Sequence, residues 1–387
     1  MEWRTPPRAP PRPRRGSRRP AAGRGHAPTP DADRRRDLAV LPKAHLHLHF
    51  TGSLSVPTLI DLAAAREVEL PEQLIDSIAL EVPADKRGWF RFQRLYDVAR
   101  SVVRGEDALR TVVARAAAED AAEGSRRLEL QVDPTSYAGS VGGLQPALEI
   151  VLDEARAASA RTGVQVGIIV AGSRIRHPFD ARTLARLAAR YVGQGPGEVC
   201  GFGLSNNEWE GPTDEWDGAF RIARRAGLPG VPHAGELRGP EHVAEVVEAL
   251  QPTRIGHGVR TVEDPFLLDR IVGAGIAFEV CPASNVQLGV YPTLADVPLR
   301  PLLAAGARVA LGADDPLLFL SRLTDQYATA RGVHGLSDDA LAGLARSSIE
   351  ASFAAETDKR RWLDEVDSWL LASTDERSDV GTAAGRR

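Results

Sequence analysis

The chain has 387 residues, enough for one large α/β domain or two ordinary ones, and a formal net charge of −4. Residues 1–36 carry a net charge of +8, so the remaining residues carry −12. This acidic body argues against nucleic acid as a binding partner, because neutralising phosphates requires a basic face.

The composition also predicts a cytoplasmic protein without a membrane anchor. The two cysteines, Cys200 and Cys281, are far apart and form no Cys-x-x-Cys motif, so we expect reduced, buried thiols. No apolar run approaches the roughly 18 residues that a membrane helix needs, and the N-terminus lacks the apolar segment of a signal peptide. We therefore expect a soluble chain with no membrane partner.

The two ends of the chain have the composition of flanking tails. Residues 1–36 are mainly Arg, Pro, Gly and Ala and cannot bury enough apolar surface to offset their conformational entropy. We predict that residues 1–36 and 373–387 are disordered, which leaves residues 37–372 as the folded domain. A basic arm that contacts RNA or another anionic surface is a second interpretation of the first tail, and translation from an upstream start codon is a third.

In residues 41–54, three histidines alternate with apolar residues and a Thr-Gly-Ser turn follows. On a β-strand this period of two directs His45, His47 and His49 to one face. The turn places His47 and His49 at the carboxyl end of the strand, where two imidazoles can bind one metal ion from the same side. Taken alone, the pattern fits equally well a buried strand with hydrogen-bonded histidines.

Residues 54–124 show helical periodicity and no convincing strand. Within this segment Trp89, Phe92 and Tyr96 recur at helical spacing. These aromatic side chains either pack a helix onto the body or form a lid over a flat substrate, and the sequence leaves both interpretations open.

Short apolar strands then alternate with helices over the rest of the chain. Eight strands separated by helices predict an α/β fold of the (β/α)8 TIM barrel class. Residues 54–124 form a helical insertion after strand 1, and extra C-terminal helices follow residue 337. The predicted strands are the one that ends at His49 and residues 128–132, 165–171, 199–203, 230–233, 253–256, 277–281 and 308–312, and a helix is predicted over 316–331 after the last of them.

Polar residues gather where the predicted strands end, which is the face that carries the active site in such barrels. Taken singly, Asp314 and Asp315 could cap a helix, and His257 could be a turn residue. Their coincidence with other strand ends predicts a metal-dependent hydrolytic site. Strand 1 ends in His47 and His49, strand 5 in His233 and Glu236, strand 6 in His257, and strand 8 in Asp314 and Asp315.

Four other histidines have no such placement. His26, His177, His242 and His334 fall in the N-terminal tail, in a loop or in predicted helices. We interpret them as solvated surface residues.

Five motifs occur in an order that resembles the adenosine deaminase family of the amidohydrolase superfamily, from about residue 41 to about residue 331. They are His47-x-His49, His233-Ala-Gly-Glu236, Gly256-His257-Gly258, Phe278-Glu-Val-Cys-Pro282 and Asp314-Asp315-Pro316. The resemblance implies a small-molecule purine nucleoside as the ligand and hydrolytic deamination as the reaction.

The same resemblance implies one zinc ion per subunit. The implied zinc ligands are His47, His49, His233 and Asp314. Glu236 would protonate purine N1, His257 would position and deprotonate the water on zinc, and Asp315 would hydrogen-bond N7. Zinc lowers the pKa of a bound water to about 7, so hydroxide is available to attack C6 at neutral pH.

Three positions depart from the adenosine-specific pattern. That pattern has Glu where this chain has His45, for which we expect a structural role one layer deeper in the barrel. It has an Asp that contacts the ribose 5′-hydroxyl where this chain has Thr51. The purine-edge loop has Ser-Asn-Asn at 205–207 instead of a Gly-Asp pair, although the backbone N–H of Asn206 could still meet N3.

The absence of a carboxylate at Thr51 points to a nucleoside that is substituted at its 5′ position. Together with residues 133–137 and 173–178, the pattern resembles the deaminases that convert 6-aminodeoxyfutalosine to futalosine in the alternative menaquinone pathway. That substrate carries a benzoate at its 5′ end. The expected partners are Arg174 or Arg176 for the benzoate carboxylate, and Phe92, Tyr96 or Tyr137 for its ring.

The sequence leaves other functions open. One is deamination of adenosine, in purine salvage, or of 5′-deoxy or methylthio derivatives. Another is a different amidohydrolase reaction on the same barrel, such as adenine deamination or ester hydrolysis. The last is a non-catalytic paralogue that binds a nucleoside or a protein partner.

Overall fold

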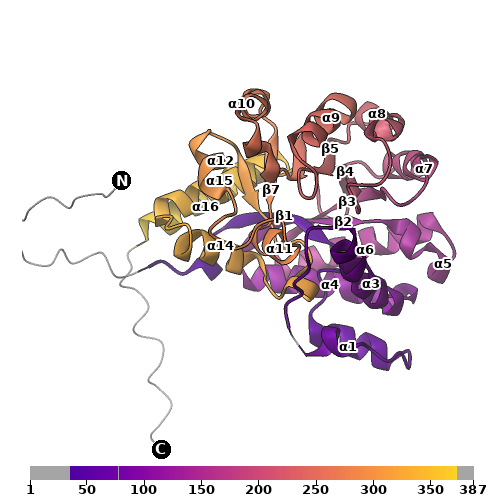
Figure 1. Cartoon of the computed structure of the whole chain (residues 1–387). Coiled ribbons are helices and arrows are strands. Elements are labelled where there is room, and N and C mark those ends of the chain that lie inside the picture. Colours follow the sequence, from indigo (N-terminus) through magenta and orange to yellow (C-terminus); the bar gives the residue numbers. More distant parts are fainter. Residues whose placement is uncertain (1–34, 77, 373–387) are drawn as a thin grey trace, which may run out of the picture. The chain divides into compact units, whose positions relative to one another are not determined.

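The computed structural model describes residues 35–76 and 78–372 (Figure 1). The segments predicted to be disordered, 1–36 and 373–387, lie outside the described residues except for residues 35 and 36. Arg36 is attached to the folded body, because its guanidinium donates hydrogen bonds to the main-chain oxygens of Trp369 (3.1 Å) and Leu370 (2.6 Å).

Eight parallel strands within the described residues form one sheet in sequential order, each strand hydrogen-bonded to the next. A parallel bridge between Leu48 and Asp314 brings the last strand back against the first, so the sheet forms a nearly closed barrel. This confirms the predicted (β/α)8 barrel. The strands are β1 (Lys43–His49), β2 (Ser125–Val132), β3 (Gln165–Ser173), β4 (Val199–Ser205), β5 (Gly230–Ala234), β6 (Arg254–His257), β7 (Ala277–Val280) and β8 (Val309–Leu311).

Helices separate successive strands, with an insertion after β1 and two extra helices at the C-terminal end (Figure 1). The insertion comprises α1 (Val56–Ala64), α2 (Glu72–Ile75), α3 (Lys86–Val102) and α4 (Gly105–Ala122). The helices between later strands are α5 (Ala138–Val141), α6 (Leu144–Thr162), α7 (Pro178–Ala188), α8 (Asp217–Arg225), α9 (Pro240–Leu250), α10 (Pro265–Gly273), α11 (Pro282–Gln287) and α12 (Leu299–Ala304). After β8 come α13 (Pro316–Phe319), α14 (Leu323–Gly332), α15 (Asp338–Ala351) and α16 (Glu356–Leu371). Short 3-10 helices lie at Leu38–Val40, Pro134–Ser136, Thr213–Trp216 and Val259–Glu263.

Local sequence signals explain where several helices begin and end. Proline occupies the first turn of α7, α9 and α10, where its missing N–H leaves no bond unmade. The Asp85 side chain caps α3 by accepting the N–H groups of Arg87 (2.9 Å) and Gly88 (2.7 Å). The helix predicted over 316–331 is interrupted, because Leu320 adopts a φ of +48° between α13 and α14. Over the residues that the structure describes, no helix combines the length and the apolar character needed to cross a membrane.

Four charged side chains form a network inside the barrel. Arg254 on β6 donates to Glu279 on β7 (Nε to Oε1, 2.6 Å) and to Glu129 on β2 (Nη2 to Oε2, 2.7 Å). Arg127 donates to the other oxygen of Glu129 (3.1 Å). Burial raises the pKa of the two carboxyls, but Arg254, together with Arg127 at Glu129 and with His47 at Glu279, outweighs burial and holds the pKa of each below its usual value. Both acids therefore stay ionised inside the barrel.

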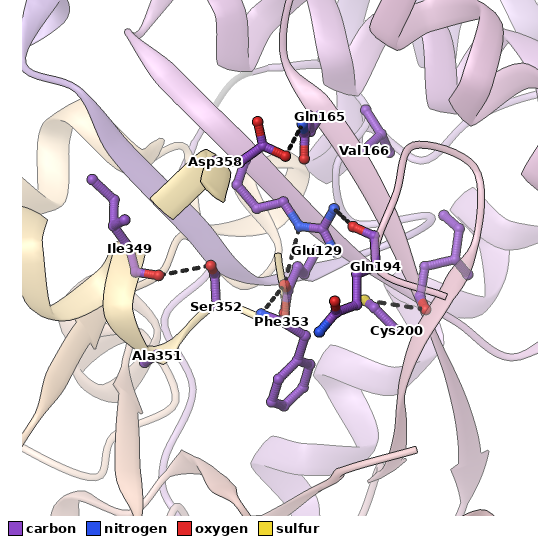
Figure 2. Close-up of polar contacts among 12 residues, drawn as sticks. Glu129, Gln165, Val166, Gln194, Cys200, Ile349, Ala351, Ser352, Phe353 and Asp358 are labelled. Atoms are coloured by element: carbon purple, nitrogen blue, oxygen red, sulfur yellow. Dashed lines mark hydrogen bonds and ion pairs between the residues drawn. The ribbon is translucent and has the colours of Figure 1, made fainter. Parts of the chain in front are cut away.

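The turn between α15 and α16 is attached to the same network (Figure 2). The main-chain N–H of Phe353 donates to Glu129 Oε1 (2.6 Å). The Arg254 guanidinium lies 3.7 Å from the centroid of the Phe353 ring. Further along, Asp358 on α16 accepts a hydrogen bond from Gln165 at the start of β3 (2.9 Å). The extra C-terminal helices thus help to satisfy the charges buried in the barrel.

Replacing Arg254 with Met should lower the free energy of unfolding by about 3–5 kcal/mol, because two buried carboxylates would lose the cation that they share, leaving Glu129 with Arg127 and Glu279 with His47. The matched control is Arg346→Met, since Arg346 forms an exposed ion pair with Asp367, and such pairs contribute about 0–1 kcal/mol. Urea unfolding followed by tryptophan fluorescence measures both changes. A loss below about 1 kcal/mol for Arg254→Met would contradict the role of the network.

Candidate active site

The carboxyl ends of four strands bring imidazole rings and a carboxylate together at one end of the barrel. The ring centroid of His47 on β1 lies 4.8 Å from that of His233 on β5 and 4.7 Å from that of His257 on β6. His49, the last residue of β1, has its Nε2 atom 3.1 Å from Oδ1 of Asp314, which follows β8. The structure therefore gathers the four residues predicted as zinc ligands into one cluster.

Two carboxylates make a positive charge favourable at His47. Its Nδ1 atom lies 2.7 Å from Glu279 Oε2, and its Nε2 atom lies 3.5 Å from Asp314 Oδ1. Burial lowers the pKa of this imidazole, but the two acidic neighbours outweigh burial and raise the pKa to about 10. Because metal ions and protons compete for the same nitrogen, a position that attracts a proton this strongly also suits a cation.

Three buried ring nitrogens of the cluster have no hydrogen-bond partner within the described residues. They are the Nε2 atoms of His47, His233 and His257. An unpaired buried polar atom is unfavourable, so such atoms in a native site need a ligand. Imidazole nitrogens and a carboxylate oxygen are the donors that zinc binds in four-coordinate sites. The imidazoles of His47, His49 and His233 and the carboxylate of Asp314 are therefore groups of the kind that a zinc ion binds.

The backbone at the cluster is strained at two positions. Asp314 and His257 both have a φ of +63°, a left-handed conformation that is uncommon for residues other than glycine. Asp314 is held there by β1, because its N–H donates to the main-chain oxygen of His47 and its own oxygen accepts the N–H of His49, each at 3.0 Å. Strain of this kind persists where the surrounding structure fixes the conformation, which is common at functional sites.

His45 lies one layer below the cluster, as expected, and has a structural role. Its Nδ1 atom is 3.0 Å from Asp120 Oδ1 on α4, and its Nε2 atom accepts a hydrogen bond from the N–H of Ala313 (3.1 Å). Both ring nitrogens are engaged, so His45 has no lone pair left for a metal ion. The contact with Ala313 fixes the residue immediately before Asp314.

Both cysteines are buried free thiols, which agrees with the prediction from their spacing. Cys281 lies beside the cluster, with Sγ within 4.8 Å of ligand atoms of His47 and Asp314. Its thiol donates to the main-chain oxygen of Glu279 (3.7 Å), and burial raises its pKa well above the usual value. A neutral thiol is a poor metal ligand, so the imidazoles are the better donors.

Glu236 and Asp315 face the cluster as carboxyls that retain their protons. Each is only 3% exposed. Burial raises the pKa of both carboxyls well above the usual value, and the negative charge of Asp314 raises it further. His257 Nε2 lies 3.6 Å from Glu236 Oε1, and burial lowers the pKa of that imidazole to about 4. These shifts favour the protonated form of the two acids and the neutral form of the His257 ring.

At two positions in the site, the absence of a glycine Cβ atom leaves room for neighbouring polar side chains. A Cβ atom added at Gly52 would lie 1.7 Å from Oδ1 of Asp315. A Cβ atom at Gly256 would lie 2.8 Å from Cδ2 of His233 and 3.0 Å from Cε1 of His47. The close approach of these groups therefore requires glycine at both positions.

An open cleft of about 700 Å³ leads to the cluster. Trp89, Phe92 and Tyr96, all on α3, form part of its wall. The Phe92 ring also stacks on Phe319, with the centroids 5.7 Å apart and the planes at 7°. The aromatic residues of α3 thus pack against the body, as one of the two interpretations predicts, and they also line the cleft; a lid over a flat substrate stays a prediction.

The structure divides the residues that were predicted to bind substrate into two groups. Thr51 is fully buried, and its Oγ1 atom lies 2.7 Å from the Tyr137 hydroxyl. The Arg176 side chain is 39% exposed, with Nε 3.6 Å from Asp133 Oδ2. Phe92, Tyr137 and Asn206 line the cleft, whereas Thr51, Arg174 and Arg176 are not among the lining residues.

Arg174 requires a correction, because it lies behind the site and not in the cleft. It is 3% exposed, and its Nη2 atom donates to the main-chain oxygen of His233 (3.1 Å). Burial lowers the pKa of its guanidinium to about 10. Its position after β3 suggested a substrate contact, but the side chain turns toward the neighbouring strand end.

The prediction of solvated histidines was wrong for two of the four residues, and a third, His26, lies outside the described residues. His242 is 1% exposed and His334 is 6% exposed. His242 Nδ1 lies 3.7 Å from Glu208 Oε2, inside the protein. His177 is exposed as predicted, and its Nδ1 atom caps α7 by accepting the N–H of Phe179 (3.1 Å).

Three charged residues near the cluster received no role in the sequence prediction. Arg100 on α3 lines the cleft, and its Nη1 atom lies 3.3 Å from the Ser136 hydroxyl. Glu279 orients His47, and it occurs in the motif 278–282, so the sequence did contain a signal for it. Glu208 accepts hydrogen bonds from the turn that carries Glu236, a contact with no local sequence signature.

Known proteins resemble this chain over nearly the whole barrel. A model of the family described as adenosine deaminase matches residues 42–369. A Streptomyces coelicolor protein provisionally named adenosine/adenine deaminase is 53% identical over 345 residues, which cover 88% of this chain and all of that protein. An adenine deaminase of Agrobacterium fabrum is 34% identical over 324 residues, which cover 84% of this chain and 97% of that protein.

A comparison with solved structures finds a protein of the same kind as these relatives. The crystal structure of an adenine deaminase from Arthrobacter aurescens matches with a TM-score of 0.77 and 29% identity, over 86% of this chain and 99% of that one. The family match and the relatives extend over the same strands that bring the histidines and acids together. The chain therefore belongs to the adenosine deaminase family of the amidohydrolase superfamily, as a hydrolytic deaminase of the adenosine/adenine type.

Proposed function

We propose that this chain deaminates the adenine ring of a 5′-substituted nucleoside, such as 6-aminodeoxyfutalosine of the menaquinone pathway, with one zinc ion per subunit. The observation that carries the proposal is the cluster of unpaired imidazole nitrogens around Asp314, with two protonated acids beside it. In the reaction, water adds at C6, its oxygen stays on that carbon, and the amino group leaves as ammonia.

The proposed zinc ligands are His47, His49, His233 and Asp314. Asp314 Oδ1 lies 3.5 Å from His47 Nε2 and 3.1 Å from His49 Nε2, and the His233 ring centroid lies 4.8 Å from that of His47, which supports the proposal. When bound, zinc supplies a Lewis acid that lowers the pKa of water to about 7, so a nucleophile is available at neutral pH. His257 would accept a proton from the attacking water at Nε2, because its low pKa keeps the ring neutral. The ring hydrogen would then be on Nδ1, which lies 3.4 Å from the side-chain amide nitrogen of Asn285, so this role requires the Asn285 amide to be turned so that its oxygen accepts that hydrogen.

Glu236 and Asp315 would bind the purine through their protons. Attack at C6 makes N1 basic, and Glu236, which burial and Asp314 keep protonated, would deliver a proton there. N7 is only an acceptor, so the group that meets it must be a donor, and the raised pKa of Asp315 provides one. The N–H of Asn206, in the cleft wall, would donate to N3.

The far end of the cleft supports a substrate with an anionic 5′ group. Thr51 carries no charge to repel an anion, and its hydroxyl is already bonded to Tyr137. Arg100 lines the cleft near this pair, since it contacts the hydroxyl of Ser136, the residue before Tyr137. With both predicted arginines outside the lining, we assign Arg100 to the benzoate carboxylate.

Adenine or adenosine is the second candidate substrate. The names of two relatives favour it, since one is called an adenosine/adenine deaminase and the other an adenine deaminase. A free base would need only the contacts proposed for Glu236, Asp315 and Asn206. With a free base bound, water would occupy the part of the cleft near Arg100.

Parallel rate measurements with adenine, adenosine and 6-aminodeoxyfutalosine test the proposed function. We expect kcat/KM for 6-aminodeoxyfutalosine to exceed the other two values by at least about tenfold, because a hydrogen bond to a charged group contributes about 1.5–3 kcal/mol. Chelation should abolish turnover, and added zinc should restore it. Equal or faster turnover of adenine or adenosine would assign the chain to purine salvage, and turnover that survives chelation would contradict a zinc site.

Arg100→Gln should raise KM for 6-aminodeoxyfutalosine by about 10–100-fold and leave KM for adenosine within about twofold, because only the first substrate carries a carboxylate. Arg87→Gln is the matched control, since Arg87 is exposed on the same helix and does not line the cleft. Steady-state kinetics on both substrates give the comparison. If KM rises equally for the two substrates, Arg100 does not recognise the carboxylate.

Gly52→Ala should lower kcat/KM by about 100-fold or more, because the new methyl group would displace Asp315 from the purine-binding position and a shift near 1 Å can have that effect. Gly343→Ala on α15 is the matched control, since a Cβ atom there meets no other group within 4 Å. Both variants are compared with the wild type under identical zinc loading. Activity of Gly52→Ala within a few fold of wild type would show that Asp315 is not needed where it lies.

A further inference from the structure

Glu208, three residues after the end of β4, holds the turn that follows β5. Its carboxylate accepts hydrogen bonds from three successive main-chain N–H groups, those of Glu236 (3.2 Å), Leu237 (2.9 Å) and Arg238 (2.8 Å). Glu208 is fully buried and is not among the residues that line the cleft. Glu208 therefore binds the main chain at and next to Glu236, the proposed proton donor, and is not placed to contact a substrate in the cleft.

Arg260 holds the opposite side of the same turn. Its N–H donates to the main-chain oxygen of Gly235 (3.1 Å), and its Nη1 atom donates to that of Leu237 (2.8 Å). The turn begins at Gly235, which has a φ of +69°. The N–H groups of residues 236–238 are thus bound by the Glu208 side chain, whereas the carbonyl groups of Gly235 and Leu237 are bound by the main chain and the side chain of Arg260. A loop fixed on both sides in this way has little freedom to move its side chains.

Two buried nitrogen-bearing side chains, those of Arg174 and His242, lie near the charge of Glu208. Arg174 attracts it electrostatically, and His242 Nδ1 lies 3.7 Å from its Oε2 atom. Burial opposes ionisation, but His242, the N–H of Arg238 and Arg174 together lower the pKa of Glu208 to about 2. The carboxylate is therefore an acceptor for all three N–H groups. Arg174 also donates to the main-chain oxygen of His233, so it links Glu208 to the strand end that bears a proposed zinc ligand.

We propose that Glu208 is a positioning residue for Glu236: its carboxylate fixes the turn at 235–238 so that the acid faces the purine ring. The proposal rests on the proposed role of Glu236 as the proton donor. A glutamine at position 208 would keep one acceptor oxygen and replace the other with an amide group that can only donate. The hydrogen bonds to Leu237 and Arg238, which share Oε2, could then not coexist with the bond to Glu236.

A double-mutant cycle between Glu208→Gln and Glu236→Gln, in the zinc-loaded full chain, tests the proposal. Glu208→Gln should lower kcat by about 10–100-fold, with KM and zinc content within about twofold of wild type, because a misplaced acid slows proton delivery but not binding. In the Glu236→Gln background it should lower kcat by less than about twofold, since the group that it positions is already lost. Equal losses in both backgrounds would overturn the proposal, because they would indicate a general structural role.

Amide hydrogen exchange separates a failure of this proposal from a failure of the proposed function, because it needs no substrate. In Glu208→Gln, exchange at residues 236–238 should speed up by about tenfold or more, while exchange in the barrel strands stays unchanged. Unchanged exchange at 236–238 would overturn the positioning role whatever the substrate is. If Glu236→Gln keeps wild-type kcat, the role of Glu236 fails instead, and the exchange result still decides whether Glu208 holds the turn.

Arg260→Met provides a second test if Glu208→Gln does not fold, because the Arg260 side chain is 31% exposed and its ion-pair partner Glu263 is 41% exposed, so its removal leaves no buried charge unpaired. It should lower kcat by about 3–10-fold, again without effect in the Glu236→Gln background. Glu248→Gln, an exposed acid on α9, is the matched control and should change neither kcat nor exchange. A kcat within twofold of wild type for Arg260→Met would overturn the dependence of Glu236 on the turn.

Discussion

The hydrogen bond between Glu279 and His47 connects the interior of the barrel to the cluster at its carboxyl end. Glu279 is shared by His47 (2.7 Å) and Arg254 (2.6 Å), and Arg254 is shared in turn with Glu129. None of these groups is stable in the interior alone, because a buried charge without a partner is strongly unfavourable. The orientation of a proposed zinc ligand therefore depends on residues on β2, β6 and β7 and, through Phe353, on the C-terminal helices.

The same restriction on buried charge gives the three acids at the cluster different protonation states. Asp314 is ionised because His47 and His49 outweigh burial and hold its pKa well below the usual value. Its charge then keeps Glu236 and Asp315 protonated, since like charges cannot all ionise in one buried site. One acid is thus suited to a cation and two are suited to the nitrogens of a purine. Backbone geometry adds to this division, because the turn held by Glu208 fixes where Glu236 points.

The barrel and the cluster could be predicted from the sequence because both leave local signals. The alternation at His47 and His49, followed by a turn, was enough to place two imidazoles at a strand end. Which arginine reaches the cleft could not be predicted in this way. Arg174 is drawn inward by the main-chain oxygen of His233, whereas Arg100 comes from the helical insertion and enters the cleft through tertiary packing alone. His242 is buried for a similar reason, since its neighbour Glu208 is distant in sequence.

X-ray absorption at the zinc edge, on the purified full chain, tests the metal-centred site most directly. We expect one zinc ion per subunit with only nitrogen and oxygen ligands at about 2.0–2.2 Å, as a three-histidine, one-aspartate set requires. A sulfur ligand at about 2.3 Å would place Cys281 on the metal and contradict the proposed set. A chain that retains no zinc after purification and cannot be reloaded would contradict the metal centre itself.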